Sequence, residues 1–177
     1  MKIVDLSQSL FDKMPVYPGD PECNIAQIHF IEKDGWNLRY LKFSSHIGTH
    51  ADAFSHMVEG GAKLDELLIE RFIGEAVLVG AEESFPKSTG LAFRQGKLTL
   101  ALFKKLKAAE PRFVIVGDEA ELAVELERKL LQNGILTITD LVNMKQLPKD
   151  KPFMFYGVPL KIKDGDGSPI RAFAVLD

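Results

Sequence analysis

The sequence predicts a single α/β domain over residues 1–177, rich in strands and with two main helices. The first observation is composition, because 46% hydrophobic and 27% charged residues in a chain of this length are typical of one globular domain. The second is a series of short alternating or apolar runs, which are typical of strands. The third is a pair of segments whose apolar residues recur with a helical period. Because no repeat, linker or low-complexity tract divides the chain, we expect one domain.

The first half of the chain is expected to consist mainly of strands. Alternating or continuous apolar runs predict strands at 3–10, 24–32, 37–46 and 72–81. The prolines and the glycine of MPVYPGDPE (14–22) indicate an ordered loop between the first two strands. AKLDELL (62–68) predicts a short helical turn before the buried strand at 72–81.

The second half is expected to alternate between helices and strands. Helical periodicity predicts a helix at 99–109, with Thr99 as its N-cap, and a longer helix at 119–134. Asn133 and Gly134 stand where helices commonly end. Apolar runs predict strands at 112–117, 135–139, 152–159 and 170–176.

Charge and composition exclude several classes of partner. The net charge is −3 and the basic residues are scattered, so the chain offers no basic stripe for a phosphate backbone, and no nucleic acid is expected to bind. No apolar run approaches the ~20 residues that span a bilayer, so no membrane partner is expected. The single Cys23 and an N-terminus without a long apolar segment favour a cytoplasmic protein.

Three of the four histidines and an aspartate lie within HIGTHADAFSH (46–56). Imidazole nitrogen and carboxylate oxygen are the usual ligands for zinc and similar ions, and a catalytic site typically has three, which His46, His50 and Asp52 supply. In an extended segment these three residues and His56 would all face one way, because alternate residues share a side. A helix would place Asp52 about 240° around its axis from His46.

The alternative is that these histidines are ordinary polar residues satisfied by hydrogen bonds. That interpretation suits His29, which lies in a strand pattern with no acidic neighbour in phase. For the cluster we prefer a metal-binding or catalytic role, because scattered placement of four histidines rarely puts three of them beside an in-phase aspartate.

The cluster resembles a known signature. HIGTHADAFSH is similar to H-x-G-T-H-x-D-x-P-x-H of the cyclase family of metal-dependent hydrolases, which includes kynurenine formamidase. Three further stretches resemble family motifs: VYPGDP (16–21), LLQNGILTITDLVNM (130–144) and VPLKIKDGDGSPIRAFAV (158–175). The resemblance therefore covers nearly the whole chain in the right order.

The resemblance implies a fold, a ligand set and an assembly. It implies that His46, His50 and Asp52 bind metal, with Asp52 as the bridge if two ions are present. It also implies that His56 is the general acid/base and that Tyr17 lines the substrate pocket. The implied fold is a swivelling β/β/α fold with a barrel-like mixed β-sheet. Because members of this family are usually dimers or tetramers, a homodimer or homotetramer is expected.

Three positions depart from the family pattern. Phe54 replaces a proline, so we expect it to change the stiffness of the loop and, with Tyr17, to offer aromatic surface to the substrate. Glu127 stands where the family has a histidine ligand. Thr139 stands where the family has a glutamate that contacts the metals.

The predicted helix adds its own information on Glu127. This residue falls near the middle of the apolar arc of 119–134, where a carboxylate is costly unless it is paired or bound to metal. Glu127 is therefore a candidate ligand, while exposure to solvent or pairing with an arginine stays an alternative. Asp140, one residue from Thr139 on a predicted strand, is expected to face away from the site. KDGDGSP (163–169) lacks the spacing of a calcium loop and predicts a tight turn.

The expected function is hydrolysis of a small amide or cyclic amide, as in an arylformamidase, through a metal-activated water. The cofactor would be a divalent metal, zinc or manganese, with one or two ions per chain. His56 would carry the proton from water to leaving group. The alternative is a catalytically altered relative that binds metal or a small molecule without hydrolysing it. In either case the expected partner is a small-molecule substrate or ligand.

Overall fold

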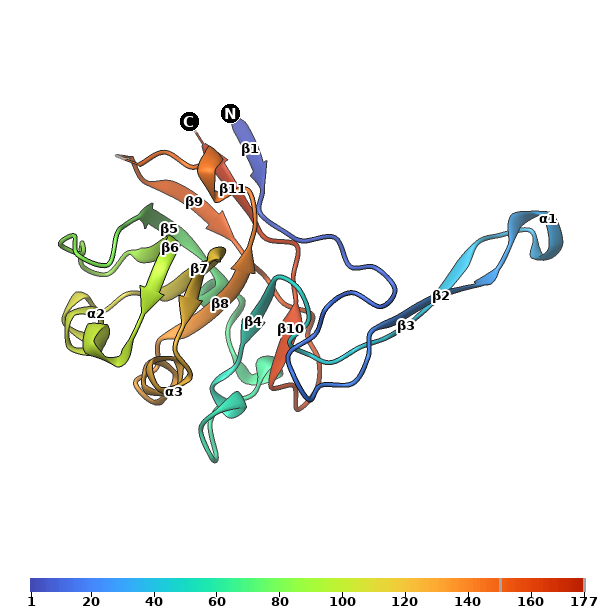
Figure 1. The fold of residues 1–177 in the computed structure, drawn as a ribbon, viewed down its shortest axis with the longest axis horizontal. Coiled ribbons are helices and arrows are strands. Elements are labelled where there is room, and N and C mark those ends of the chain that lie inside the picture. Colours follow the sequence, from blue (N-terminus) through green and yellow to red (C-terminus); the bar gives the residue numbers. More distant parts are fainter. Residues whose placement is uncertain (150, 177) are drawn as a thin grey trace.

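One strongly curled mixed sheet of nine strands forms the body of the computed structural model, which describes residues 1–149 and 151–176 (Figure 1). The order across the sheet is β1 (Lys2–Asp5), β11 (Phe173–Leu176), β9 (Phe153–Tyr156), β5 (Ile73–Leu78), β6 (Gly90–Leu98), β7 (Phe113–Leu122), β8 (Leu136–Leu141), β4 (His50–Asp52) and β10 (Gly167–Pro169). Strands β5 to β8 run parallel, and the other pairs are antiparallel. This arrangement confirms the predicted swivelling β/β/α fold with its barrel-like mixed sheet.

The two main helices are α2 (Phe103–Ala109) and α3 (Val124–Gln132), and both cover one face of the parallel strands (Figure 1). Alternate strand residues such as Leu91 and Val114 pack with Leu106 and Leu130 of the helices. The intervening residues, Ala92 and Ile115 among them, face a second core inside the curve of the sheet. Burial on both faces is usual for parallel strands. No helix in the described part of the chain is long and apolar enough to cross a bilayer.

The predicted helix at 119–134 begins too early. Strand β7 continues to Leu122, paired in parallel with Leu98 of β6, and α3 starts only at Val124. The alternation of EAEL (119–122) fits a strand once β6 lies beside it, which the periodicity of one segment could not reveal. The predicted end is confirmed, because Gly134 has φ +74 and its N–H donates to the carbonyl of Leu131.

Two further differences concern the centre of the chain. Strand β6 was not predicted, since Arg94, Gln95 and Gly96 interrupt its apolar run. The ring of Phe113 on β7 lies against Gly90 of β6. A Cβ added at Gly90 would come within 2.2 Å of this ring. The predicted helix at 99–109 starts as a 3-10 turn at Leu100–Leu102, and Thr99 makes no side-chain cap.

A two-stranded arm projects from the body. It consists of β2 (Asn24–His29) and β3 (Leu38–Lys42), with the short helix α1 (Ile31–Asp34) at its tip (Figure 1). The predicted strands at 24–32 and 37–46 are therefore present but shorter. The arm leaves the body between the loop that carries Tyr17 and the turn that carries His46.

Candidate metal centre

The donor atoms of His46, His50 and Asp52 lie within 4.8 Å of one another at β4, which is next to the edge strand β10. His50 and Asp52 sit two residues apart on this strand, so their side chains share one face. Strand β4 lies between β8 and β10, which buries Asp52 completely. The structure thus brings together the three residues that the sequence singles out as ligands.

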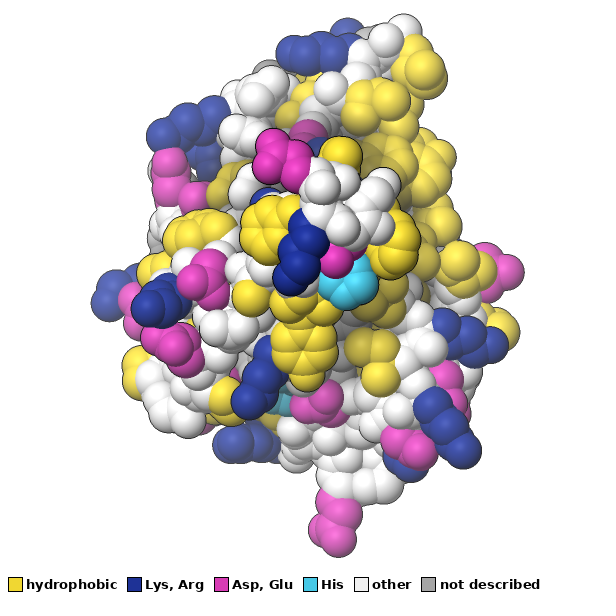
Figure 2. Space-filling view, turned by 90° about the vertical axis from the view of Figure 1, so that its right-hand side faces the viewer, with side chains coloured by type: hydrophobic (Ala, Val, Ile, Leu, Met, Phe, Trp, Pro, Cys, Tyr) yellow, Lys and Arg dark blue, Asp and Glu magenta, His cyan; other side chains and the backbone are white. Residues whose placement is uncertain are grey.

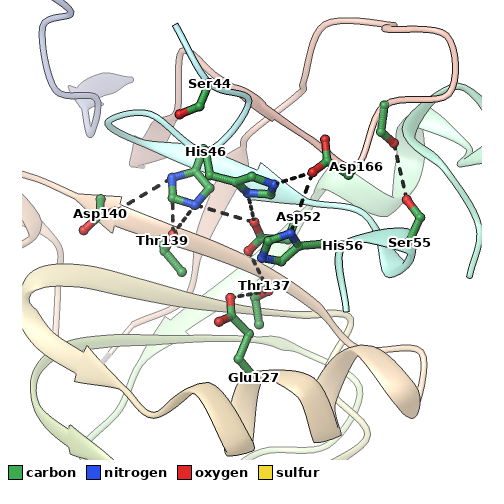
Figure 3. Close-up of polar contacts among 12 residues, drawn as sticks. Ser44, His46, Asp52, Ser55, His56, Glu127, Thr137, Thr139, Asp140 and Asp166 are labelled. Atoms are coloured by element: carbon green, nitrogen blue, oxygen red, sulfur yellow. Dashed lines mark hydrogen bonds and ion pairs between the residues drawn. The ribbon is translucent and has the colours of Figure 1, made fainter. Parts of the chain in front are cut away.

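The chain from His46 to His56 reaches this arrangement without being extended throughout. Gly48 adopts φ +56 and turns the chain between His46 and His50, and the segment Phe54–His56 is a 3-10 turn. Only the short strand β4 has the expected alternation. The expectation of one extended segment is therefore wrong, although His50 still lies beside the His46, Asp52 and His56 side chains that Figure 3 labels.

His50 is oriented by the backbone. Its Nδ1 lies 2.7 Å from the carbonyl oxygen of Gly48, which can only accept, so Nδ1 donates to it and Nε2 is the nitrogen that faces Asp52 and Thr139. Nε2 lies 3.5 Å from Oδ1 of Asp52 and 3.1 Å from the hydroxyl of Thr139. A backbone carbonyl on one ring nitrogen is the common arrangement behind a metal-binding histidine.

His46 bridges two carboxylates. Its Nδ1 lies 2.8 Å from Oδ1 of Asp52, and its Nε2 lies 3.0 Å from Oδ2 of Asp166 (Figure 3). Burial disfavours the charged ring, but the hydrogen bonds and negative charges of Asp52 and Asp166 outweigh it and raise the pKa of His46 to about 9. The ring also lies against Gly167, where an added Cβ would come within 2.3 Å of it.

His56 lies next to this pair. Its ring centroid is 3.9 Å from that of His46, and its Nδ1 is 3.8 Å from Oδ2 of Asp166. Burial, and then the positive charge of His46, lower the pKa of His56 below its ordinary value. The ring is therefore neutral at pH 7 and able to accept a proton.

Glu127 reaches the centre from α3. Its Oε1 lies 3.4 Å from the hydroxyl of Thr137, which in turn donates to Oδ2 of Asp52 at 2.8 Å (Figure 3). Burial and the charge of Asp52 raise the pKa of Glu127 to about 8. Among the ion pairs of residues 1–149 and 151–176, none links Glu127 to an arginine, so the pairing that the sequence left open is not present there.

A cavity of about 680 Å³ opens in front of these residues. Tyr17 lines it, as do apolar residues that include Val16, Ile47, Met57, Val116 and Val124. Phe54, which was expected to join Tyr17 in offering aromatic surface, does not border this cavity. Its ring packs against the core inside the sheet, with the guanidinium of Arg71 5.7 Å from its centroid. This placement follows from the 3-10 turn, which aims His56 at the cavity and Phe54 at the core.

Asp140 was expected to face away from the site, and this expectation is wrong. Asp140 has φ +60 at an irregularity in the pairing of β7 with β8, so the usual alternation does not apply. Its carboxylate borders the cavity, with Oδ2 3.8 Å from Nδ1 of His50. Thr139 faces the cavity as well, which places both residues next to His50.

Asp166 and Thr137 belong to the site although the sequence did not single them out for it. Asp166 precedes β10, whose Gly167 pairs with Asp52, so the strand pairing delivers its carboxylate to His46. The turn predicted over 163–169 is present only at its start, because β10 occupies Gly167–Pro169, with Asp166 directly before it. Thr137 is fully buried, and a buried hydroxyl on a predicted strand was the signal available.

The donor set fits a divalent cation. Two groups of possible ligands share His46, one with His50 and Asp52 and the other with His56 and Asp166. Asp52 is a buried carboxylate whose partners are histidine rings and a threonine hydroxyl, and a buried charge of this kind needs strong compensation. A mixed set of nitrogen and oxygen donors does not select one divalent metal.

Comparison with known proteins gives relatives over the full length. A kynurenine formamidase of Erythrobacter litoralis is 32% identical and matches over 97% of this chain and 92% of its own length. A kynurenine formamidase of Salinibacter ruber is 26% identical and matches over 97% of this chain and 96% of its own length. An uncharacterized protein of Methanocaldococcus jannaschii is 32% identical over 99% of this chain and all of its own length.

Solved structures show the same fold. Isatin hydrolase A from Ralstonia solanacearum has a TM-score of 0.79 at 20% identity, over 99% of this chain and 92% of its own. Isatin hydrolase A from Labrenzia aggregata, bound to benzyl benzoate, has a TM-score of 0.76 at 23% identity, over 98% and 93% of the two chains. The family model described as putative cyclase matches residues 4–117, which include the histidine cluster. The chain therefore belongs to the cyclase family of metal-dependent hydrolases.

Proposed function

We propose that this protein hydrolyses a small amide or cyclic amide, in the manner of an arylformamidase, and that residues 1–177 form one catalytic unit. The observation that carries the proposal is the convergence of His46, His50 and Asp52 at a cavity of about 680 Å³, with His56 beside them. A cavity of this size with a few convergent polar groups is typical of a small-molecule site.

The ligand roles follow from the donor atoms. His46, His50 and Asp52 would hold zinc or manganese, and Glu127 is the proposed carboxylate that extends the set from α3. When bound, a divalent ion lowers the pKa of a coordinated water and polarises the scissile carbonyl. Thr137 orients Asp52 and Glu127 toward one another through its hydroxyl.

His56 is the proposed general base and acid. Its neutral ring takes a proton from the attacking water and returns it to the leaving nitrogen, the usual work of a histidine near its own pKa. Asp166 lies near this ring, with its Oδ2 3.8 Å from Nδ1. Tyr17 and the apolar residues that line the cavity are the proposed binding surface for an aromatic substrate.

The kynurenine formamidase relatives support an arylformamide as the substrate class, because they match over nearly the full length of this chain. The same relatives disfavour the alternative of a binding protein without activity. One or two ions per chain, a homo-oligomeric state and a cytoplasmic location are further parts of the proposal. About two ions per chain would favour a binuclear site that includes Glu127, and about one would favour His46, His50 and Asp52 alone.

The test is hydrolysis by the metal-loaded protein. The purified chain is stripped with a chelator, reloaded with zinc or manganese, analysed for metal content, and assayed with N-formylkynurenine as the formamide and isatin as the cyclic amide. We expect turnover of at least one substrate with one of the metals, and none after stripping. Metal-loaded protein that hydrolyses neither substrate would contradict the proposal.

A matched pair of variants tests the role of His56. His56→Asn is expected to lower kcat by 10²-fold or more while the metal content stays at the wild-type level, because general acid–base catalysis typically contributes 10²–10⁴-fold. His29→Asn, on the arm and away from the cavity, is the control and should keep wild-type kcat. A His56→Asn variant with full activity would rule out the proposed proton transfer.

A further inference from the structure

The cavity at the proposed metal centre is lined by acidic side chains without basic ones. Asp20, Glu127 and Asp140 border it, and no lysine or arginine of residues 1–149 and 151–176 does. The chain as a whole is nearly balanced, with 22 basic and 25 acidic residues, and Figure 2 shows both kinds interspersed over the face that bears the arm. The one-sided charge is therefore a property of the cavity and not of the whole surface.

A bound metal ion does not cancel all of this charge. Asp52 and Glu127 lie together at the centre, linked through the hydroxyl of Thr137, and their two negative charges balance one divalent ion whether or not Glu127 binds it directly. Asp20 and Asp140 belong to neither group of possible metal ligands in the described part of the chain. Two carboxylates thus remain uncompensated at the cavity when one ion is bound.

Asp20 and Tyr17 belong to one turn at the cavity. The N–H of Asp20 donates to the carbonyl of Tyr17 at 2.9 Å, and both residues line the cavity. Oδ2 of Asp20 accepts a hydrogen bond from the hydroxyl of Ser44 at 3.2 Å, which orients the carboxylate. The ion pairs of the described residues do not include Asp20. A carboxylate and an aromatic ring are together suited to an ammonium group, through an ion pair and through the face of the ring.

Asp140 supplies the second uncompensated carboxylate. Its backbone has φ +60, and its carbonyl accepts hydrogen bonds from the hydroxyl of Thr49 at 2.7 Å and from the side-chain amide of Gln8 at 3.1 Å. These bonds hold its side chain at the cavity, with Oδ2 3.8 Å from Nδ1 of His50, whereas Asp52 lies near Nε2. Because a histidine that binds metal is neutral, His50 does not compensate the charge of Asp140.

We propose that the cavity selects aryl amides that carry an ammonium group on a ring substituent, with Asp20 and Tyr17 as the ammonium site and Asp140 as a further negative charge. The inference rests on the proposed function and narrows its substrate class to cations. An amide with a carboxylate at the same place is disfavoured, because like charges repel and the lining that the structure describes offers no basic side chain to pair with it.

Three formanilides test the selection, because they separate the two charges that N-formylkynurenine combines. Their para substituents are aminomethyl, ethyl and carboxymethyl, which are cationic, neutral and anionic at pH 7, and hydrolysis of each releases formate and the corresponding aniline. With zinc-loaded protein at low ionic strength, we expect KM to rise by about tenfold at each step in that order. The differences should shrink at high salt, because mobile ions screen the charges.

Asp20→Asn removes the charge and keeps an oxygen that can accept the hydrogen bond from Ser44. In this variant we expect the ratio of kcat/KM between the aminomethyl and carboxymethyl compounds to fall by about tenfold. Glu22→Gln removes a carboxylate from the same loop at an exposed position outside the cavity lining, and should keep the wild-type ratio. Circular dichroism checks that both variants fold, and the order of the wild-type KM values decides alone if one does not.

Direct binding gives a readout that does not depend on hydrolysis. Calorimetric titration of the three compounds into zinc-loaded His56→Asn should give Kd values in the same order as the KM values. If no compound is hydrolysed by the wild-type protein but this order of Kd holds, the proposed function fails and the selection by charge stands. Equal or reversed Kd values, or an Asp20→Asn variant that keeps the wild-type preference, would overturn the selection.

Discussion

Oδ2 of Asp166 lies 3.0 Å from Nε2 of His46, although 120 residues separate the two in the sequence. The contact depends on the pairing of β10 with β4, which sets Gly167 opposite Asp52 and the ring of His46 against Gly167. Since Oδ1 of Asp52 contacts Nδ1 of His46, both ring nitrogens of His46 contact carboxylates. Its position therefore depends on a distant part of the chain.

Asp166→Asn tests this dependence. We expect metal affinity to fall about tenfold, because outer partners of metal-binding histidines typically contribute 10–100-fold. The measurement is competition with a chromophoric chelator at pH 9, where protons compete least for His46. Asp164→Asn, an exposed neighbour paired with Lys63, is the control and should keep wild-type affinity. Equal affinities in all three proteins would show that Asp166 does not support the centre.

Glu127→Gln tests the carboxylate from α3. The pKa of about 8 means that Glu127 is largely protonated at pH 7 in the metal-free protein, so ligation must release its proton. Calorimetric metal titrations in two buffers of different ionisation enthalpy should give nearly one proton fewer for Glu127→Gln than for wild type. Glu125→Gln, exposed on the same helix, should match wild type. Identical proton release in Glu127→Gln would exclude Glu127 from the ligand set.

The candidate ligands could be predicted from the sequence because they are local. His46, His50 and Asp52 fall within seven consecutive positions, and any turn or strand there keeps them near one another. Asp166 and Thr137 could not be found in this way, since only the pairing of strands distant in the sequence brings them to Asp52. Phe54 and Asp140 show the same limit, because a 3-10 turn and a positive φ decide where they point.

The fold, like the site, could be predicted only in part from the sequence. Periodicity located both main helices, and the αL residue Gly134 marked the end of α3. The predicted start of α3 was too early because the sequence of 119–122 is compatible with both a helix and a strand. These residues form a strand because they pair with β6. β6 itself has too few consecutive apolar residues to be recognised alone.

The metal-free protein should lose stability as pH rises from about 6.5 to 9. The pKa of His46 is raised from 6.5 to about 9, so its stabilising contribution is complete below 6.5 and is lost as pH passes 9. Glu127 acts in the same direction, because the folded protein keeps a proton up to about pH 8 that the unfolded chain releases near 4.5. Thermal melts in chelator across this range should show a falling Tm.

His46→Gln identifies the source of that slope. Without the titrating ring, the fall in Tm between pH 6.5 and 9 should become shallower, whereas His29→Gln on the arm should reproduce the wild-type slope. A wild-type Tm that is constant or rises over this range would show that the carboxylates do not hold a proton on His46.

Tyr17 and Phe54 should separate substrate binding from stability. Phe54 packs against the core and beneath Arg71, so Phe54→Ala should reduce the free energy of unfolding by about 3 kcal/mol, the low end for a phenylalanine because the ring is only partly buried. Tyr17 is 68% exposed at the cavity, so Tyr17→Ala should change stability by less than about 0.5 kcal/mol. Denaturant unfolding of both variants measures this difference.

For KM we expect the larger effect from Tyr17→Ala and the smaller one from Phe54→Ala, the reverse of their order in stability. Tyr17→Ala removes aromatic surface that faces the cavity and should raise the KM for an arylformamide several-fold, whereas Phe54→Ala should leave KM within about twofold of wild type. Phe54→Pro, which restores the residue typical of the family, should be as destabilised as Phe54→Ala, because position 54 opens a 3-10 turn where proline fits the backbone but cannot replace the ring. If Phe54→Ala instead raised KM and left stability unchanged, the Phe54 ring would contact the substrate and not the core, which would contradict this prediction.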